Sequence, residues 1–130
     1  MAADRIRNTK VILDTNAVLM PFQFNINLDS ELKRLLGQYE IIIPNIVIEE
    51  LNNLAAGPKP PREIRSALTL ASRYRQITVS SRGDAAVFEL AEAQNAIVVT
   101  NYKALKHRLL KAGIKTISLR GKNHLILNEI

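Results

Sequence analysis

Short apolar runs rich in β-branched residues recur along the chain and alternate with segments of helical pattern. The runs are VIL (11–13), EIII (40–43), ITV (77–79), AIVV (96–99) and TISL (116–119). Continuous apolar runs of this length are typical of strands that are covered on both faces, because both sets of alternating side chains are then buried. We therefore predict about five strands, and NHLILNEI (123–130) can form a last one.

Helical segments are predicted between these runs, over residues 29–36, 45–54, 61–74, 84–94 and 101–112. Their ends carry residues that commonly start or stop helices. Asp29 and Ser30 can cap the first helix, and Gly37 can end it. Asp84 can begin its helix, and Gly113 follows the last one.

This alternation predicts the fold class. A chain in which strands and helices alternate folds as α/β, here a three-layer α/β/α sandwich around a mostly parallel central sheet of about five strands. The segment AAGPKPPRE (55–63) contains three prolines and a glycine, so we expect it to be a loop between two helices. The 130 residues fit one domain with a real core, residues 1–130.

The chain is basic. It has 18 Lys and Arg against 12 Asp and Glu, a formal net charge of +6. Between residues 103 and 122 there are seven Lys or Arg and no Asp or Glu. Such a balance favours a polyanionic partner such as nucleic acid, although a merely soluble basic surface is the alternative.

Other classes of protein are disfavoured by composition. There is no cysteine, so disulfides and thiolate metal sites are excluded. No stretch approaches the ~18–20 apolar residues that cross a membrane, and the first ten residues lack the apolar core of a secretory signal. We therefore expect a cytoplasmic protein without a membrane partner.

Polar residues follow three of the predicted strands at the point where each strand ends. Asp14 follows VIL, Asn45 follows EIII closely, and Thr100 closes AIVVT. Ligands of open parallel sheets bind beyond the carboxyl ends of the strands, where the topology changes direction. We expect these residues to share one rim, although any strand must also simply stop somewhere.

Two more carboxylates can reach this rim. In the helix 45–54, Glu50 falls at the edge of the apolar arc and is expected to be half buried, whereas Glu49 points toward solvent. A carboxylate against the core needs a compensating group, which is either Lys or Arg or a bound cation. Asp84 is a helix cap or, if the strand 77–79 is parallel to the others, a third acid at the rim.

Three crowded carboxylates repel one another. If Asp14, Glu50 and Asp84 converge, a divalent cation is the main way to make their arrangement tolerable. Oxygen ligands alone suit Mg²⁺ or Mn²⁺.

The chain resembles the PIN-domain superfamily of small metal-dependent ribonucleases over essentially its whole length. VILDTNAVL is similar to the family's opening strand and first acid, and IIIPNIVIEEL to its second strand and second-acid helix. GDAAVFELAEAQNAIVVTN is similar to the third-acid helix and the next strand. The resemblance implies that Asp14, Glu50 and Asp84 bind Mg²⁺ or Mn²⁺ for hydrolysis of RNA phosphodiesters.

A narrower resemblance concerns the stretch MPFQFNINLDSELKRLLG. It is most similar to single-domain archaeal-type PIN proteins, which are related to nucleases that process ribosomal RNA. A homodimer is also in keeping with the family, because small PIN proteins often pair.

One position departs from the family pattern. The family often has Asp after Thr-Asn or Thr-Arg, but here Thr100 and Asn101 are followed by Tyr102. Tyrosine cannot replace a carboxylate as an anionic ligand at neutral pH, because its reference pKa is ~10. Three interpretations stay open: a metal-dependent endoribonuclease, a weak or inactive PIN module that binds RNA or protein in ribosome assembly, and a VapC-type toxin with an antitoxin partner.

Supporting residues can be assigned around these acids. Asn16 can orient Asp14, and Thr100 can orient a water molecule, with capping or turn roles as the alternative for each. Tyr102 lies at the expected rim, where it can stack on a base.

Basic side chains can bind the RNA backbone. Lys103, Lys106 and His107 share one side of the helix 101–112, with Lys111 one turn on, and can follow phosphates. A solvated helix face is the alternative. Arg62 and Arg65, beside the proline-rich loop, can also reach the backbone.

Overall fold

A six-stranded sheet forms the centre of the molecule. The computed structural model describes residues 8–129 of the chain. The strands are β1 (Thr9–Leu13), β2 (Tyr39–Pro44), β3 (Arg75–Ile77), β4 (Ile97–Val99), β5 (Thr116–Arg120) and β6 (His124–Asn128). Their order in the sheet is β3-β2-β1-β4-β5-β6, and all neighbouring pairs are parallel except β5 and β6. The predicted α/β fold with a mostly parallel sheet is confirmed, with six strands instead of about five.

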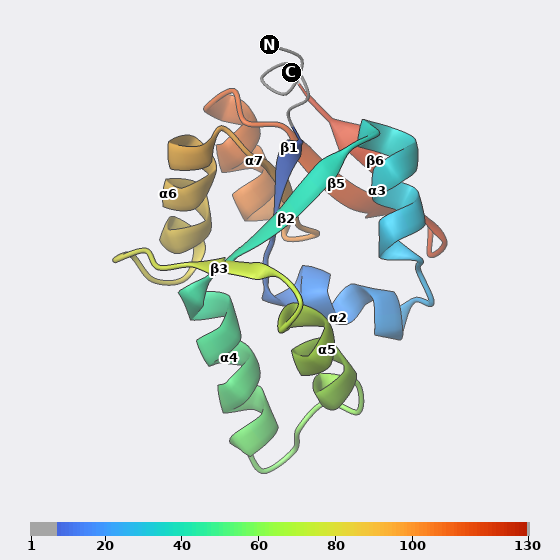
Figure 1. The fold of residues 1–130 in the computed structure, drawn as a ribbon, viewed down its shortest axis with the longest axis vertical. Coiled ribbons are helices and arrows are strands. Elements are labelled where there is room, and N and C mark those ends of the chain that lie inside the picture. Colours follow the sequence, from blue (N-terminus) through green and yellow to red (C-terminus); the bar gives the residue numbers. More distant parts are fainter. Residues whose placement is uncertain (1–7, 130) are drawn as a thin grey trace.

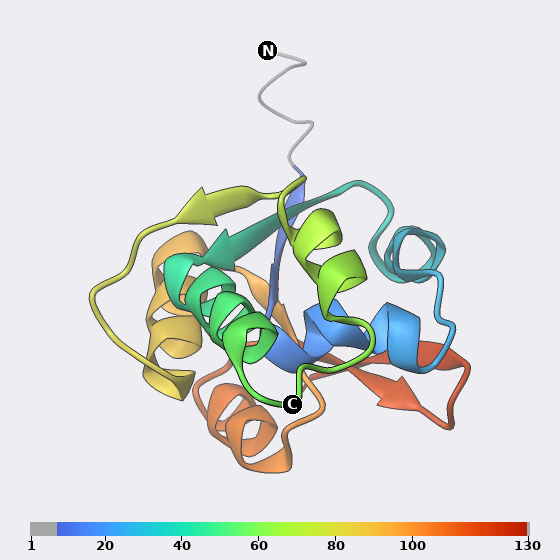
Figure 2. The ribbon, with the colours of Figure 1, turned by 90° about the horizontal axis from the view of Figure 1, so that it is seen from below.

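Helices cover both faces of this sheet (Figure 1, Figure 2). They are α2 (Thr15–Gln23), α3 (Leu28–Leu36), α4 (Asn45–Ala56), α5 (Ile64–Ala71), α6 (Asp84–Gln94) and α7 (Lys103–Lys111). Most buried residues of α2 to α5 belong to one core cluster, and most of those of α6 and α7 belong to another. None of the helices within residues 8–129 has the length and apolar character that crossing a bilayer requires.

Strand β1 shows how the sequence builds the two cores. Val11 and Leu13 pack in the cluster with α2 to α5, whereas Ile12 packs in the cluster with α6 and α7. All three side chains are fully buried. Successive side chains of a strand point to opposite faces, so a continuous apolar run is what a strand between two helical layers requires.

The sequence did not predict helix α2. Its nine residues follow Asp14 directly and include Pro21, which lacks the N–H that a helix interior uses. The proline lies within the last turn, and the helix ends two residues later, at Gln23. The four residues from Ala17 to Met20 are all buried, and this packing holds the helix against the sheet.

Several predicted boundaries also shift. Helix α3 is capped by Asn27, whose side chain accepts a hydrogen bond from the Ser30 amide at 3.0 Å, and not by Asp29 or Ser30. Gly37 does end this helix, with a positive φ of 74° that suits glycine. Strand β3 covers 75–77 instead of 77–79, and α5 is shorter than predicted at both ends.

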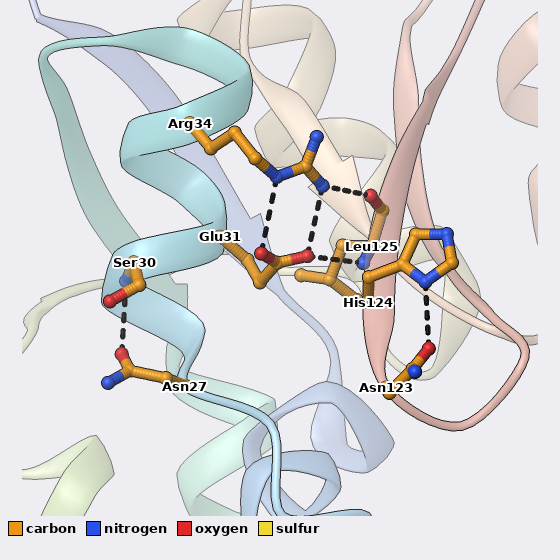
Figure 3. Close-up of polar contacts among 7 residues, drawn as sticks. All are labelled: Asn27, Ser30, Glu31, Arg34, Asn123, His124 and Leu125. Atoms are coloured by element: carbon orange, nitrogen blue, oxygen red, sulfur yellow. Dashed lines mark hydrogen bonds and ion pairs between the residues drawn. The ribbon is translucent and has the colours of Figure 1, made fainter.

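Helix α3 is joined to the edge strand β6 by a charged cluster (Figure 3). Arg34 donates to Glu31 through two nitrogens, at 3.2 and 3.0 Å. The same two side chains bind the backbone of Leu125: its N–H donates to Glu31 at 2.7 Å, and its carbonyl accepts from Arg34 at 2.7 Å. The pair thereby satisfies backbone groups that an edge strand would otherwise expose.

Candidate metal-binding nuclease site

Asp14 lies at the point in the sheet from which the strand order runs outward in opposite directions, between β1 and β4. Strand β1 has β2 on one side and β4 on the other, and the Asp14 amide, one residue beyond β1, donates to the Val99 carbonyl of β4 at 3.4 Å. The Asp14 carboxylate is the N-cap of α2 and accepts a hydrogen bond from the Ala17 amide at 2.8 Å. Asp14 therefore has a structural role, because it satisfies a free donor at the first turn of the helix.

The pKa of Asp14 is raised above its ordinary value, and burial is the largest cause. Hydrogen bonding to the Thr100 side chain and to the Ala17 amide acts in the opposite direction and lowers the pKa, without reversing the net rise. The negative charges of Asp84 and Glu50 raise it further. The fold thus holds Asp14 in surroundings that disfavour its charged form.

The three predicted acids line one small cavity. Asp14 comes from the end of β1, Glu50 from α4 and Asp84 from the start of α6, and the cavity has a volume of about 100 Å³. It is lined by Asp14, Thr15, Asn16, Val47, Glu50, Gly83, Asp84, Val87 and Tyr102. Acidic residues separated by 34 to 70 positions in the sequence therefore line the same cavity at the carboxyl ends of the strands.

The donors in this cavity suit a hydrated divalent ion better than a closed ligand cage. Over residues 8–129, no group of three or more His, Asp or Glu side chains is arranged to hold a metal ion. Mg²⁺ commonly keeps several waters and uses only one or two carboxylates, so an open set of oxygens fits such an ion. Thr15 adds a second sign: its hydroxyl oxygen is buried and lacks a hydrogen-bond partner in the described part of the chain.

Glu50 differs from its predicted burial. It is exposed, as is Glu49, although only Glu50 lines the cavity. Helix α4 buries Ile46, Val47 and Leu51. Glu50 lies beside this narrow buried stripe and not within it, so it avoids the cost of desolvation while still reaching the other acids.

Asp84 does not act as the helix cap. It is the first residue of α6, the N-cap position belongs to Gly83, and no side-chain hydrogen bond caps the helix. Gly83 has a φ of 61°, which a side chain would strain, and this turn places Asp84 at the cavity. The Asp84 carboxylate is consequently available to a ligand.

Thr100 lies close to Asp14, behind the cavity. It is fully buried and does not line the cavity, but it lies near enough to Asp14 to lower the pKa of that carboxyl, and its hydroxyl accepts from the Tyr102 amide at 3.1 Å. Asn16 lines the cavity and is exposed, and no hydrogen bond joins it to Asp14 among the described residues. Across residues 8–129, the geometry gives Asp14 one orienting hydrogen bond, from the Ala17 amide. The role predicted for Asn16, orienting Asp14, has no hydrogen bond behind it in these residues, and the role predicted for Thr100, orienting a water molecule, stays a prediction.

Two asparagines near this rim have structural roles that sequence analysis missed. The Asn45 side chain accepts from the Val79 amide at 2.9 Å and so holds the segment after β3. The Asn101 side chain accepts from the Leu119 amide at 2.8 Å and holds the end of β5. Neither lines the acidic cavity.

Comparison with known proteins identifies the family. A family model described as a PIN like domain matches residues 11–122. The chain belongs to the PIN-domain family. Ribonuclease VapC4 of Methanocaldococcus jannaschii is 31% identical to this PIN domain over 122 residues, which cover 88% of this chain and 93% of that protein. Ribonuclease VapC9 of Archaeoglobus fulgidus is 30% identical over 119 residues, covering 88% and 87%.

Solved structures agree with this assignment. The PIN domain endonuclease Utp24 superposes with a TM-score of 0.77 at 26% identity, covering 93% of this chain and 92% of that one. A domain of a functionally unknown protein from Methanocaldococcus jannaschii shares the fold, with a TM-score of 0.62 at 21% identity and coverage of 87% and 92%.

Tyr102 lines the cavity of this PIN domain and is the most exposed large apolar side chain of the described residues, at 53%. It is also the N-cap residue of α7, where it makes no side-chain capping bond. Its ring is therefore accessible at the mouth of the acidic cavity.

The basic residues predicted to bind RNA are accessible to solvent. On α7, Lys103, His107 and Lys111 are exposed and Lys106 is half buried, while Leu105 and Leu109 are buried against the sheet. This separation confirms that α7 has a core face and a charged face. Arg62 and Arg65 are exposed at the start of α5 and do not line the acidic cavity. The contact of either group with RNA stays a prediction.

Proposed function

We propose that this PIN domain is a divalent-metal-dependent endoribonuclease of the cytoplasm, with Mg²⁺ or Mn²⁺ as the ion. Asp14, Glu50 and Asp84 bind the ion, either directly or through water. The observation that supports the proposal is that these three acidic residues line one cavity, whose described lining contains no Lys or Arg. The two ribonuclease relatives, similar over 88% of the chain, support the same activity.

The residues around the cavity have different roles in the proposed hydrolysis. When bound, a divalent ion supplies a water of lowered pKa and stabilises negative charge on the phosphate and on the leaving oxygen. The Ala17 amide holds the Asp14 carboxylate in place for this ion. Asn16 and the Thr15 hydroxyl, both in the cavity lining, can bind water or a phosphate oxygen.

Tyr102 takes the place of a fourth acid and has a different role. Its exposed ring at the cavity mouth is a platform on which a base next to the cleaved phosphate stacks. The lysines of α7, with His107, continue from this point and bind phosphates through charge, with little sequence preference.

Cleavage of single-stranded RNA with added Mn²⁺ tests the proposal. Asp14→Asn should lower the cleavage rate by roughly 100-fold or more, because it removes a charged ligand of the ion. Asparagine is also a good N-cap, so α2 should stay folded and the melting temperature should be retained. Glu49→Gln is the matched control, since Glu49 is exposed, adjacent to Glu50 and outside the cavity. Equal activity of the wild type and Asp14→Asn would reject catalysis at this site.

A second candidate function follows from the absence of the fourth acid. A PIN module that binds RNA or protein in ribosome assembly would bind RNA in the same assay without cleaving it under any metal condition. Processing of ribosomal RNA by an active enzyme is the narrower form of the first proposal.

The names of the two ribonuclease relatives favour a toxin role over the assembly role. A toxin would arrest growth when expressed, and co-expression of a small antitoxin encoded next to it would relieve the arrest. Size-exclusion chromatography of the purified chain would test the expected homodimer at the same time.

A further inference from the structure

The exposed side of α5 and the turn after it carry two arginines. Arg65 and Thr69 are four positions apart, and Arg73 follows at the same interval just after the helix. Residues at this spacing lie on one face of a helix. All three are exposed, and they line one cavity of about 430 Å³ together with Phe22, Ser66 and Leu70.

Within the described residues, the two arginines have no acidic partner. The four ion pairs within residues 8–129 use Lys10, Lys33, Arg34 and Lys115 as their cations. The guanidinium groups of Arg65 and Arg73 are therefore free to bind an anion from outside the chain. Guanidinium groups match the geometry of phosphate oxygens with two parallel hydrogen bonds.

An exposed aromatic ring lies beside these arginines. Phe22, near the end of α2, is 40% exposed and lines the arginine cavity. Phe22, Leu70 and Arg73 also line a larger cavity of about 1460 Å³, which continues to Tyr39 and Tyr74. An accessible aromatic ring between cations is the combination that binds single-stranded nucleic acid, through stacking and charge together.

Among the residues that the structure describes, Asp29 is the one carboxylate that lines these two cavities. It pairs with Lys33 at 3.4 Å and accepts a hydrogen bond from the Tyr39 hydroxyl, so its charge is already compensated. The surface defined by Phe22, Arg65 and Arg73 thus favours a polyanion and offers no acid that would repel one.

This surface is separate from the acidic cavity but close to it along the chain. The two share no lining residue. Helix α2 connects them: it starts after Asp14 and reaches Phe22 eight residues later, a rise of roughly 12 Å at 1.5 Å per residue. A strand of a few nucleotides can span such a distance.

We propose that Phe22, Arg65 and Arg73 form a second contact for single-stranded RNA, remote from the acidic cavity. The arginines bind phosphates, and Phe22 stacks on a base. This inference rests on the proposed RNA substrate and adds a place for the part of the strand beyond the cleaved bond. It makes RNA binding dependent on length, because only a strand longer than a few nucleotides reaches both sites.

Binding of a fluorescent 20-nucleotide RNA in EDTA tests the second contact without catalysis. Arg65→Ala/Arg73→Ala should weaken binding by about 10-fold. It should also reduce the slope of the logarithm of the binding constant against the logarithm of the salt concentration by about 1.4, which is roughly 0.7 for each phosphate contact of a single strand. Phe22→Ala should weaken binding without changing the salt slope. The matched control is Arg120→Ala/Lys122→Ala, which removes two exposed charges near the turn between β5 and β6.

The outcomes separate this inference from the proposed nuclease function. Cleavage of a tetranucleotide by the wild type with Mn²⁺ reports on the nuclease function alone, because so short an RNA occupies only the acidic cavity. Wild-type affinity of the arginine variant for the long RNA, or an equal loss in the control, would overturn the second contact. So would preferential binding of polyglutamate over RNA at this surface. A wild type that binds but never cleaves would overturn the nuclease function alone.

Discussion

Glu31 and Asp14 are both half-buried carboxylates that accept a hydrogen bond from a backbone amide, yet their surroundings are opposite. Arg34 faces Glu31, and its hydrogen bonds hold the pKa of Glu31 below the ordinary value (Figure 3). Asp14 faces Glu50 and Asp84, and its pKa is raised, mainly by burial. The first carboxylate is stabilised by its cationic partner, whereas the ionised form of the second is disfavoured by burial and by two acidic neighbours, which is the situation that a bound cation would relieve.

A lysine beside Asp14 should give this carboxylate a cationic partner such as Glu31 has. Among the predicted variants it should have the largest effect on RNA cleavage. Asn16→Lys places an ammonium group at an exposed position of the acidic cavity, where it can pair with the carboxylates as Arg34 pairs with Glu31. The melting temperature without metal should rise, and RNA cleavage should fall by about 100-fold because the lysine competes with the ion.

Thermal denaturation with and without Mn²⁺ checks this prediction, with Asn16→Gln as the uncharged control. An Mn²⁺-dependent rise in melting temperature that is as large in Asn16→Lys as in the wild type would show that the ion binds elsewhere.

A fourth carboxylate in the acidic cavity should make the surroundings of Asp14 still more negative than those of Glu31. We expect an effect of intermediate size, on the affinity for Mn²⁺. Tyr102→Asp adds a negative charge at the mouth of the cavity, which should lower the melting temperature without metal and raise the affinity for Mn²⁺ by about 10-fold. Isothermal titration with Mn²⁺ measures the affinity, and Tyr102→Phe should leave it unchanged. If the aspartate variant binds Mn²⁺ no better than Tyr102→Phe does, position 102 does not face the ion.

Removing the charge of Glu31 should have the smallest effect and should depend on pH. Because the folded pKa of Glu31 lies below the ordinary 4.5, its ionised form stabilises the protein above that pH, and this contribution is lost as the pH falls through the folded pKa. Glu31→Gln should therefore lower the melting temperature by a few degrees at pH 7 and by less below pH 4.5. Melting curves from pH 7 to pH 3 measure this difference, and a constant difference over that range would contradict the assigned cause.

Features that adjacent residues determine were predicted from the sequence, whereas features that depend on tertiary packing were missed. The burial of Val11, Ile12 and Leu13 on both faces of the sheet and the end of a helix at Gly37 were predicted correctly. Each of these features depends on residues that are adjacent in the sequence. Helix α2 was missed because Pro21 disfavours a helix locally, while the burial of its middle residues, which favours it, comes from packing. The exposure of Glu50 was also mispredicted, since the width of the buried stripe on α4 depends on its neighbours.

The sequence by itself determined the fold class, the two buried faces of the sheet and the identity of three candidate acids, because side-chain periodicity and strand ends are local properties. Only the tertiary structure decided that Asp14, Glu50 and Asp84 line one cavity, that Thr100 lies close to Asp14, and that Phe22 lies beside Arg65 and Arg73. The reason is physical: distances between residues far apart in a chain are set by the order of strands and the packing of helices, and no local pattern fixes either.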